Sequence, residues 1–196
     1  MRIISGKFKG IKLLLPINKK TRPLKDMVKE SIFNFLIHSN KISFQLQNSL
    51  VLDLYSGTGS FGLECLSHEA KKIIFIEKDE DAIKSLEKNI LKLKEEKKVK
   101  IFCSDVFNLI EKKSHYIVSS LAGSKPDLIF CDPPFKDYNI IELSNLILLK
   151  KLLKENGVIV FHRHKNTKEN LSDCFKIIDE RVYGDSKIIF AQAHSN

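Results

Sequence analysis

The sequence predicts an α/β protein built on a doubly wound, mostly parallel sheet of seven strands, with an antiparallel hairpin at its carboxyl end. Short apolar runs alternate with longer helical patterns, and the runs are continuous, as is typical of strands buried on both faces. Four residues, 183–186, separate the last two runs, which is too few for a helical crossover. We expect strands at 50–54, 73–77, 99–103, 127–131, 157–161, 175–182 and 187–193, and helices near 60–69, 80–97, 105–113 and 138–155.

A small basic extension precedes this sheet. Residues 2–15 predict a short hairpin around a glycine-containing turn, and a helix is expected over about 24–38 because its apolar residues fall on one face. Pro23 suits the start of that helix. We therefore expect residues 1–45 to form an extension with a role of its own and residues 46–196 to form the sheet domain.

The formal net charge of +9 is concentrated in that extension. Residues 1–29 hold nine cations and one anion, Asp26, so they carry +8. A basic arm on a near-neutral domain is typical of proteins that bind nucleic-acid phosphates, although a solubilising tail would have the same composition. The candidates for nucleic-acid contact are Arg2, Lys7, Lys9, Lys12, Arg22, Lys25 and Lys29.

Other features of the composition exclude several classes of protein. No apolar run approaches the ~20 residues of a membrane span, and the first ten residues lack the apolar stretch of a signal peptide. The four cysteines stand far apart without a C-x-x-C pair, so neither a zinc site nor a disulfide framework is expected, which indicates a reducing cytoplasm. The H-x-H pair of His162 and His164 lacks a third candidate ligand and is interpreted as a solvated strand end, so no metal is expected.

A glycine-rich turn follows the first strand of the sheet. Gly57-x-Gly59-x-x-Gly62 lets the backbone turn tightly and approach a ligand, while the helix behind it offers free N–H groups. Glu77, at the end of the second strand, is placed to accept hydrogen bonds from ribose hydroxyls, and Asp53 suits a ligand that carries a positive charge. The candidate cofactor residues are Asp53, Tyr55, Gly57, Gly59, Glu77, Asp105 and Val106.

This turn indicates a nucleotide-containing cofactor but does not by itself separate NAD from S-adenosylmethionine, because both carry a ribose. Asp105, just after the third strand, could accept a hydrogen bond from an adenine amino group or cap the helix that follows. A second motif, Asp132-Pro133-Pro134-Phe135, would be left unexplained by an NAD oxidoreductase. It follows the fourth strand, which lies beside the first in a doubly wound order, where such sheets place their active sites.

The Asp-Pro-Pro-Phe motif resembles that of methyltransferases that use S-adenosylmethionine to modify exocyclic amino groups of bases. Together with RIISGKFKG at 2–10, TRPLKDMVKESIFNFL at 21–36, VLDLYSGTGSFGLECLSHEA at 51–70 and YGDSKIIF at 183–190, it resembles the RsmD-type family, which methylates N2 of one guanine in small-subunit (16S) ribosomal RNA. The resemblance covers nearly the whole chain. It implies a Rossmann-like methyltransferase domain behind an RNA-binding extension.

The resemblance also implies roles for the motif residues. Asp132 and the Pro133 carbonyl would accept the two hydrogens of the guanine amine, Pro134 would stiffen the turn, and Phe135 would stack on the flipped base. The expected partner is small-subunit ribosomal RNA or an assembling small subunit, bound by a monomer away from any membrane. Two alternatives stay open: an adenine-N6 DNA methyltransferase, for which the chain leaves no room for a separate DNA-reading domain, and an RNA-binding module without catalysis.

Overall fold

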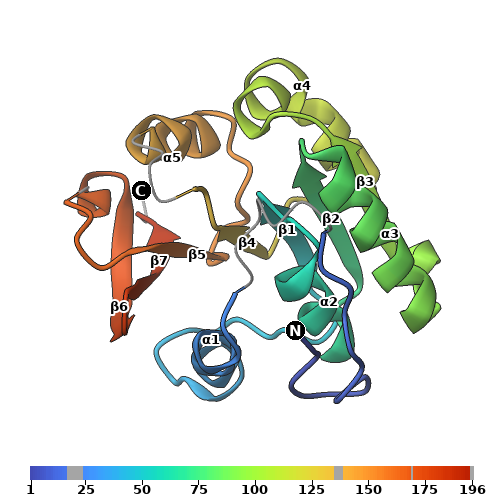
Figure 1. The fold of residues 1–196 in the computed structure, drawn as a ribbon. Helices are drawn as coiled ribbons and strands as arrows, with labels where there is room; N and C mark the ends of the chain where they lie inside the picture. The colour runs from blue at the N-terminus through green and yellow to red at the C-terminus, as the bar shows by residue number, and fades with distance from the viewer. Residues whose placement is uncertain (17–23, 135–138, 169, 195–196) are drawn as a thin grey trace.

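The computed structural model describes residues 1–16, 24–134, 139–168 and 170–194, whose fold is shown in Figure 1. Its strands are β1 (Leu50–Leu54), β2 (Lys72–Glu77), β3 (Val99–Cys103), β4 (Leu128–Cys131), β5 (Val158–His164), β6 (Phe175–Tyr183) and β7 (Ser186–Ala193). Within the described residues they form one seven-stranded sheet in the order β3-β2-β1-β4-β5-β7-β6. Strands β1 to β5 are parallel, while β7 pairs antiparallel with β5 and β6, which confirms the predicted fold class.

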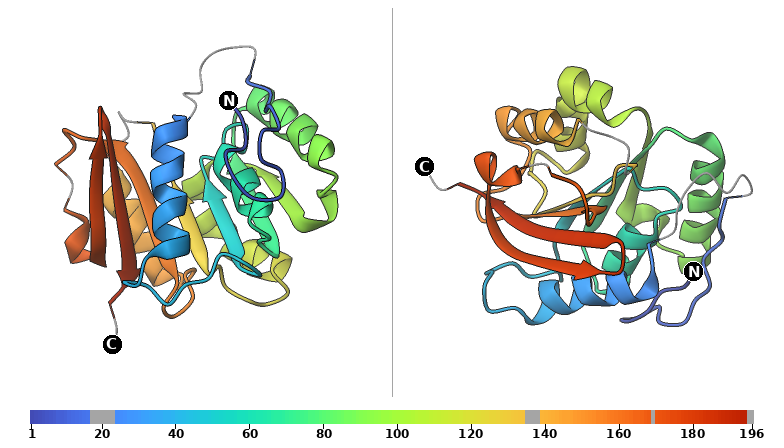
Figure 2. Two further views of the ribbon diagram at one scale, coloured as in Figure 1. Left: turned by 90° about the horizontal axis from the view of Figure 1, so that it is seen from below. Right: turned by 60° about the vertical axis from the view of Figure 1, so that its left-hand side comes forward.

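Helices cover both faces of the sheet, as Figure 2 shows from two further directions. The helices are α1 (Asp26–His38), α2 (Ser60–Ser67), α3 (Glu80–Leu93), α4 (Val106–Ser120) and α5 (Ile140–Leu149). Alternate residues of each central strand face opposite layers, so that one apolar cluster joins the sheet to α1, α2 and α3 and the other joins it to α4 and α5. In the described part of the chain, no helix has the length and apolar character needed to cross a membrane.

Some helix ends differ from the predicted ones because single residues leave the helical region of backbone space. α3 ends at Leu93 because Lys94 adopts φ +55, and a short 3-10 turn, Glu96–Lys98, follows. α4 continues to Ser120, past its predicted end, and the non-helical backbone of Lys113 marks a kink inside it. α5 is shorter than predicted. These differences lie away from the strand ends that carry the candidate site residues.

The extension forms the predicted hairpin with little regular pairing. Arg2 and Lys12 make one antiparallel bridge, and the Ile3 N–H donates to the Ile11 carbonyl over 3.0 Å. Ile3 and Leu13 are buried in the same apolar cluster as α1 and the sheet. Because extension and sheet share this core, the predicted boundary at residue 45 does not divide the chain into independently packed bodies.

The antiparallel hairpin at the carboxyl end closes one side of the sheet. Tyr183 and Ser186 pair directly, and Gly184 between them adopts φ +58, a left-handed conformation that glycine accepts at little cost. A hydrogen bond of 2.7 Å from the Ser31 hydroxyl to the Tyr183 hydroxyl ties this hairpin to α1. The hairpin is confirmed, and its turn holds Ser186 beside the end of β5.

Candidate active site

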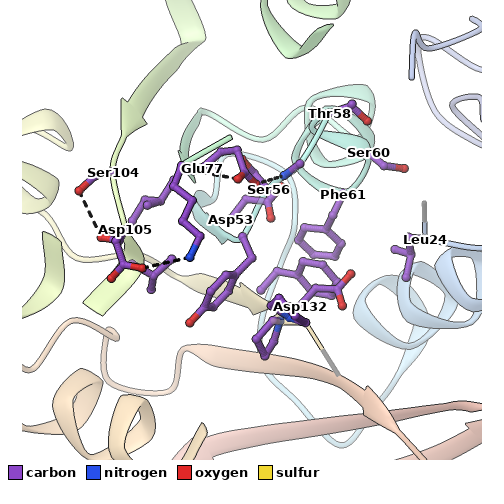
Figure 3. A pocket seen from close by; sticks show the side chains of 18 of the residues that line it. Leu24, Asp53, Ser56, Thr58, Ser60, Phe61, Glu77, Ser104, Asp105 and Asp132 are labelled. Atoms are coloured by element: carbon purple, nitrogen blue, oxygen red, sulfur yellow. Dashed lines mark hydrogen bonds and ion pairs between the residues drawn. The ribbon is translucent and has the colours of Figure 1, made fainter. Parts of the chain in front are cut away.

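A cavity of about 380 Å³ opens at the carboxyl ends of β1 and β4, where the strand order reverses (Figure 3). Doubly wound sheets bind their ligands at this point, and cofactor pockets commonly hold roughly 300–1,000 Å³. The structure brings together in its wall nine of the residues that the sequence predicts: Asp53, Tyr55, Gly57, Glu77, Asp105, Val106, Asp132, Pro133 and Pro134.

The glycine-rich turn is held in a left-handed backbone path. Tyr55 and Gly57 adopt φ +59 and +54, and a non-glycine residue in this region costs about 1–3 kcal/mol that the surrounding fold must offset. Gly59 does not line the cavity. Gly59 adopts φ +83, a left-handed conformation that favours glycine, and it lies against the Leu86 side chain of α3.

Asp53 is the buried carboxylate at the base of the cavity. It is 1% exposed and accepts a hydrogen bond of 3.0 Å from the Gly62 N–H. Burial raises the pKa of Asp53 well above its ordinary value, the Gly62 hydrogen bond opposes that rise, and the charges of Asp132 and Glu77 add to it. A cationic ligand would relieve this repulsion, whereas a pyrophosphate would increase it.

Glu77 is oriented by three backbone N–H groups. Its Oε2 accepts from Gly57 over 2.7 Å, and its Oε1 accepts from Lys78 over 2.8 Å and from Asp79 over 2.9 Å. A carboxylate has about four acceptor sites, so capacity for a ligand hydroxyl remains. Glu77 therefore connects the glycine turn to the end of β2 and presents acceptor oxygens to the cavity.

Asp105 caps a helix and also lines the cavity. Its side chain caps α4 by accepting from the Asn108 N–H over 3.3 Å, while the residue also lines the cavity beside Val106. Lys78 lies 3.6 Å from Asp105 Oδ2 across the opening. The N-cap role therefore does not exclude contact with a ligand.

Asp132 directly follows β4, and its side chain reaches a buried histidine. Its Oδ1 lies 2.8 Å from His162 Nδ1, and His162 Nε2 lies 2.9 Å from the Ser186 hydroxyl. His162 is 2% exposed, so the prediction of a solvated strand end is wrong for this residue, whereas His164 is half-buried. Phe135 lies outside the described residues. No group of three His, Cys, Asp or Glu side chains within the described residues could hold a metal ion.

The cavity also has walls that the motifs did not indicate. Phe61 and Phe130 line it and stack on each other, with ring centroids 3.9 Å apart and planes at 12°. The buried Ser56 hydroxyl, also in the wall, has no hydrogen-bond partner among the described residues and suits a polar group of a bound cofactor. Met1 and Leu15 contribute from the extension. The residues present thus fit a nucleoside cofactor with a positively charged centre.

The cations predicted to contact RNA do not share one environment. Arg2 forms an ion pair of 3.4 Å with Asp26, and Lys7 forms one of 3.2 Å with Glu95. Arg22 lies outside the described residues. The exposed members of the set are Arg2, Lys7, Lys9, Lys12 and Lys25.

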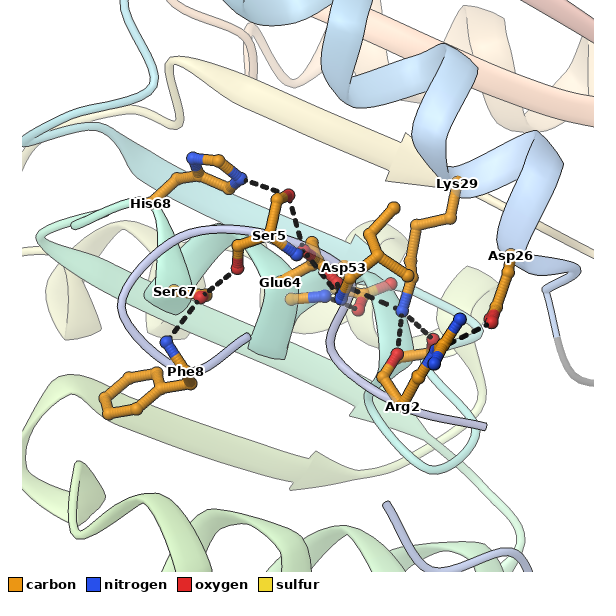
Figure 4. Close-up of polar contacts among 12 residues, drawn as sticks. Arg2, Ser5, Phe8, Asp26, Lys29, Asp53, Glu64, Ser67 and His68 are labelled. Carbon is orange, nitrogen blue, oxygen red and sulfur yellow. Dashed lines mark hydrogen bonds and ion pairs between the residues drawn. The ribbon is translucent and has the colours of Figure 1, made fainter. Parts of the chain in front are cut away.

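Lys29 departs from this set, and its prediction as an RNA contact is wrong. Its side chain is 0% exposed, and its Nζ lies 3.1 Å from Oε2 of the equally buried Glu64 (Figure 4). The Lys29 ammonium also donates to the Arg2 carbonyl over 2.6 Å and to the Ser60 hydroxyl over 3.3 Å. Lys29 therefore joins α1 both to the hairpin of the extension and to Ser60, the first residue of α2.

Glu64 is the centre of this buried cluster, and sequence reasoning missed it. Besides Lys29, it accepts from the Ile4 N–H over 2.9 Å, from the Ser5 N–H over 2.8 Å and from the Ser5 hydroxyl over 2.9 Å. The Glu64 carboxylate thus replaces strand pairing as the partner of the hairpin backbone. The extension is fixed to the helix that borders the cavity.

Comparisons with known proteins agree with this geometry. A family model described as "Conserved hypothetical protein 95" matches residues 1–192. Ribosomal RNA small subunit methyltransferase D of Haemophilus influenzae is 30% identical over 187 residues, which cover 94% of this chain and 89% of the relative. The protein of the same name from Escherichia coli strain K12 is 31% identical over 157 residues, covering 80% of this chain and 68% of the relative.

A solved structure described as "Putative methyltransferase yhhF from Escherichia coli" superposes with a TM-score of 0.82 at 26% identity, covering 100% of this chain and 99% of that chain. The match therefore includes the extension as well as the sheet. The chain belongs, as its motifs predict, to the RsmD-type family of S-adenosylmethionine-dependent methyltransferases.

Proposed function

We propose that this protein transfers a methyl group from S-adenosylmethionine to the exocyclic N2 amine of a guanine in small-subunit ribosomal RNA, in the cytoplasm. The observation that carries the proposal is that Asp132, Pro133 and Pro134 line the same cavity as Asp53 and Glu77. An amine held by the first group would lie next to a cofactor held by the second. The names of the relatives support ribosomal RNA as the substrate.

The chain's own residues account for binding of the cofactor. Asp53 and Glu77 supply negative charge and acceptor oxygens, and Asp105 supplies a further acceptor at the far side of the cavity. Bound S-adenosylmethionine would supply an electrophilic methyl group. The buried charge of Asp53 would stabilise the positive charge of this cofactor more strongly than it would in water.

Asp132 and Pro133 would act on the substrate amine. The nitrogen lone pair of a guanine N2 amine is delocalised into the ring, so the amine must be held with its lone pair out of the ring plane. A carboxylate and a backbone carbonyl that accept its two hydrogens would hold it so, and both hydrogen bonds would strengthen as positive charge develops on nitrogen. The stacked Phe61 and Phe130 offer an apolar wall to a flipped base, beside the Phe135 proposed from sequence.

The test uses purified protein, labelled S-adenosylmethionine, and two forms of substrate from cells that lack the modification: naked small-subunit RNA and the assembled small subunit. We expect N2-methylguanosine after digestion to nucleosides, and no product from Asp132→Ala, whose cofactor affinity should be little changed by calorimetry. Methyladenine formed in duplex DNA would support the alternative enzyme. Binding of RNA without methyl transfer by the wild-type protein would support the module without catalysis.

A further inference from the structure

We propose that His162 is a positioning residue for methyl transfer: its imidazole holds the Asp132 carboxylate in the orientation that the substrate amine requires. The inference rests on the proposed role of Asp132 and extends it to the neighbouring strand. The distances are 2.8 Å from His162 Nδ1 to Asp132 Oδ1 and 2.9 Å from His162 Nε2 to the Ser186 hydroxyl.

The register of the sheet places these three side chains close together on one face. Cys131 pairs with Phe161, so the next residues lie side by side, with Asp132 just beyond the end of β4 and His162 within β5. Residues level with each other on adjacent strands point to the same face. Ser186 begins β7 and pairs with His164, two residues beyond His162, so it lies diagonally from His162 on the same face of the sheet.

The two contacts match one tautomer of the imidazole. A carboxylate accepts hydrogen bonds, so the contact with Asp132 calls for a proton on His162 Nδ1, and in that neutral tautomer Nε2 accepts from the Ser186 hydroxyl. A hydrogen bond from His162 to Oδ1 restricts rotation of the Asp132 carboxylate. The other acceptor sites of this carboxylate remain available to a ligand in the cavity, which Asp132 lines.

Packing alone does not explain a histidine at this position. The residues before it in β5, Val158 to Phe161, are apolar and fully buried, and a buried imidazole is costly unless its nitrogens are bonded. The partner of one nitrogen is the carboxylate assigned to the substrate, whose side chain is still 22% exposed at the cavity. The His162 imidazole therefore connects the buried part of β5 to the Asp132 carboxylate at the carboxyl end of β4.

Two variants separate positioning from packing. In His162→Asn the amide nitrogen can occupy the place of Nδ1 and still donate to Asp132, but the shorter side chain leaves a void. In His162→Gln the longer side chain fills the space better and reaches the place of Nε2, near Ser186, without serving Asp132. If His162 positions Asp132, His162→Asn should retain more activity than His162→Gln. If His162 only fills space, His162→Gln should retain more.

The experiment measures kcat, the KM for RNA, S-adenosylmethionine affinity and Tm for both variants beside wild type and Asp132→Ala. Loss of one hydrogen bond to a charged group corresponds to a fall of roughly 10- to 100-fold in kcat for His162→Gln, while His162→Asn should stay within about 5-fold of wild type. Cofactor affinity should change little in either. If His162→Gln retained wild-type kcat, or if both variants lost kcat in proportion to Tm, the positioning role would be refuted. An inactive wild type would instead refute the proposed function, and with it the basis of this inference.

Discussion

Replacing Lys29 by methionine should destabilise the protein rather than weaken its hold on RNA. Both side chains of the Lys29–Glu64 pair are 0% exposed and their charged atoms lie 3.1 Å apart. Methionine matches the length of lysine but leaves the Glu64 carboxylate with neutral donors in a buried place. Removing one partner of a buried ion pair costs about 3–5 kcal/mol, and at this chain length each kcal/mol lowers Tm by ~2–4 °C, so we expect a fall of roughly 6–20 °C.

Thermal or urea unfolding of Lys29→Met is compared with Lys9→Met, which removes an exposed cation and should change stability by no more than about 0.5 kcal/mol. In the double variant Lys29→Met/Glu64→Gln no buried charge remains. Its loss should therefore be smaller than the sum of the single losses by about 0.5–3 kcal/mol. A Lys29→Met protein of nearly wild-type stability whose RNA binding had become less sensitive to salt would refute the reasoning and return Lys29 to the RNA-binding set.

Three further outcomes are expected. Glu77→Ala should weaken S-adenosylmethionine binding in calorimetry, because ligand acceptors and the Gly57 hydrogen bond are both lost; an unchanged affinity would remove Glu77 from the cofactor site. The pKa of Asp53 is raised in the folded state. The free energy of unfolding is therefore highest, as far as Asp53 is concerned, below the unfolded-state pKa, and it falls as pH rises toward the folded-state pKa. Asp53→Asn should therefore raise Tm near neutral pH and much less at acid pH while weakening cofactor binding, and a Tm difference independent of pH would contradict this. Lys9→Gln and Lys12→Gln should each flatten the salt dependence of RNA affinity by about one unit or less in log–log slope, and filter binding that shows no change would favour the solubilising tail.

Substitutions that remove single charges test the role of the extension in RNA binding better than deletion of its hairpin does. Ile3 and Leu13 belong to the core, and Met1 lines the cavity. Deleting residues 1–15, which the sequence alone would present as a clean way to separate RNA binding from cofactor binding, would expose that core and open the cavity wall. Its loss of activity would not distinguish the two functions.

The parts of the fold that follow from local patterns could be predicted from sequence. Strands such as β1 have continuous apolar runs, and the turn at Gly184 is too short for anything but a hairpin. The end of α3 could not be predicted, because the charged segment after Leu93 is compatible with helix until Lys94 adopts a left-handed backbone.

That residues line one cavity could be predicted where chemistry and strand ends coincide, as at Asp53, Glu77 and Asp132. The errors concern residues whose partners are distant in sequence. Lys29 counts as one cation among nine, although its spacing from Ile32 and Leu36 puts it on the buried side of α1. The helical periodicity therefore indicates that Lys29 is buried and needs a partner. That the partner is Glu64 depends on how α1 packs against α2. His162 meets Asp132 only through the pairing of β4 with β5.

The same arrangement explains why a glycine turn shared with dinucleotide-binding proteins serves a different cofactor here. In the folded protein Asp53 is buried, and the charges of Asp132 and Glu77 add to the rise that burial causes in its pKa, so the cavity disfavours further negative charge. A ligand with a positive centre would lower the repulsion among these carboxylates, whereas a pyrophosphate would add two more negative charges to the same space. We therefore expect cofactor selection in this fold to depend less on the glycines, which set the backbone path, than on the carboxylates near the carboxyl ends of β1, β2 and β4, and a bound cation would offset part of the cost of burying Asp53.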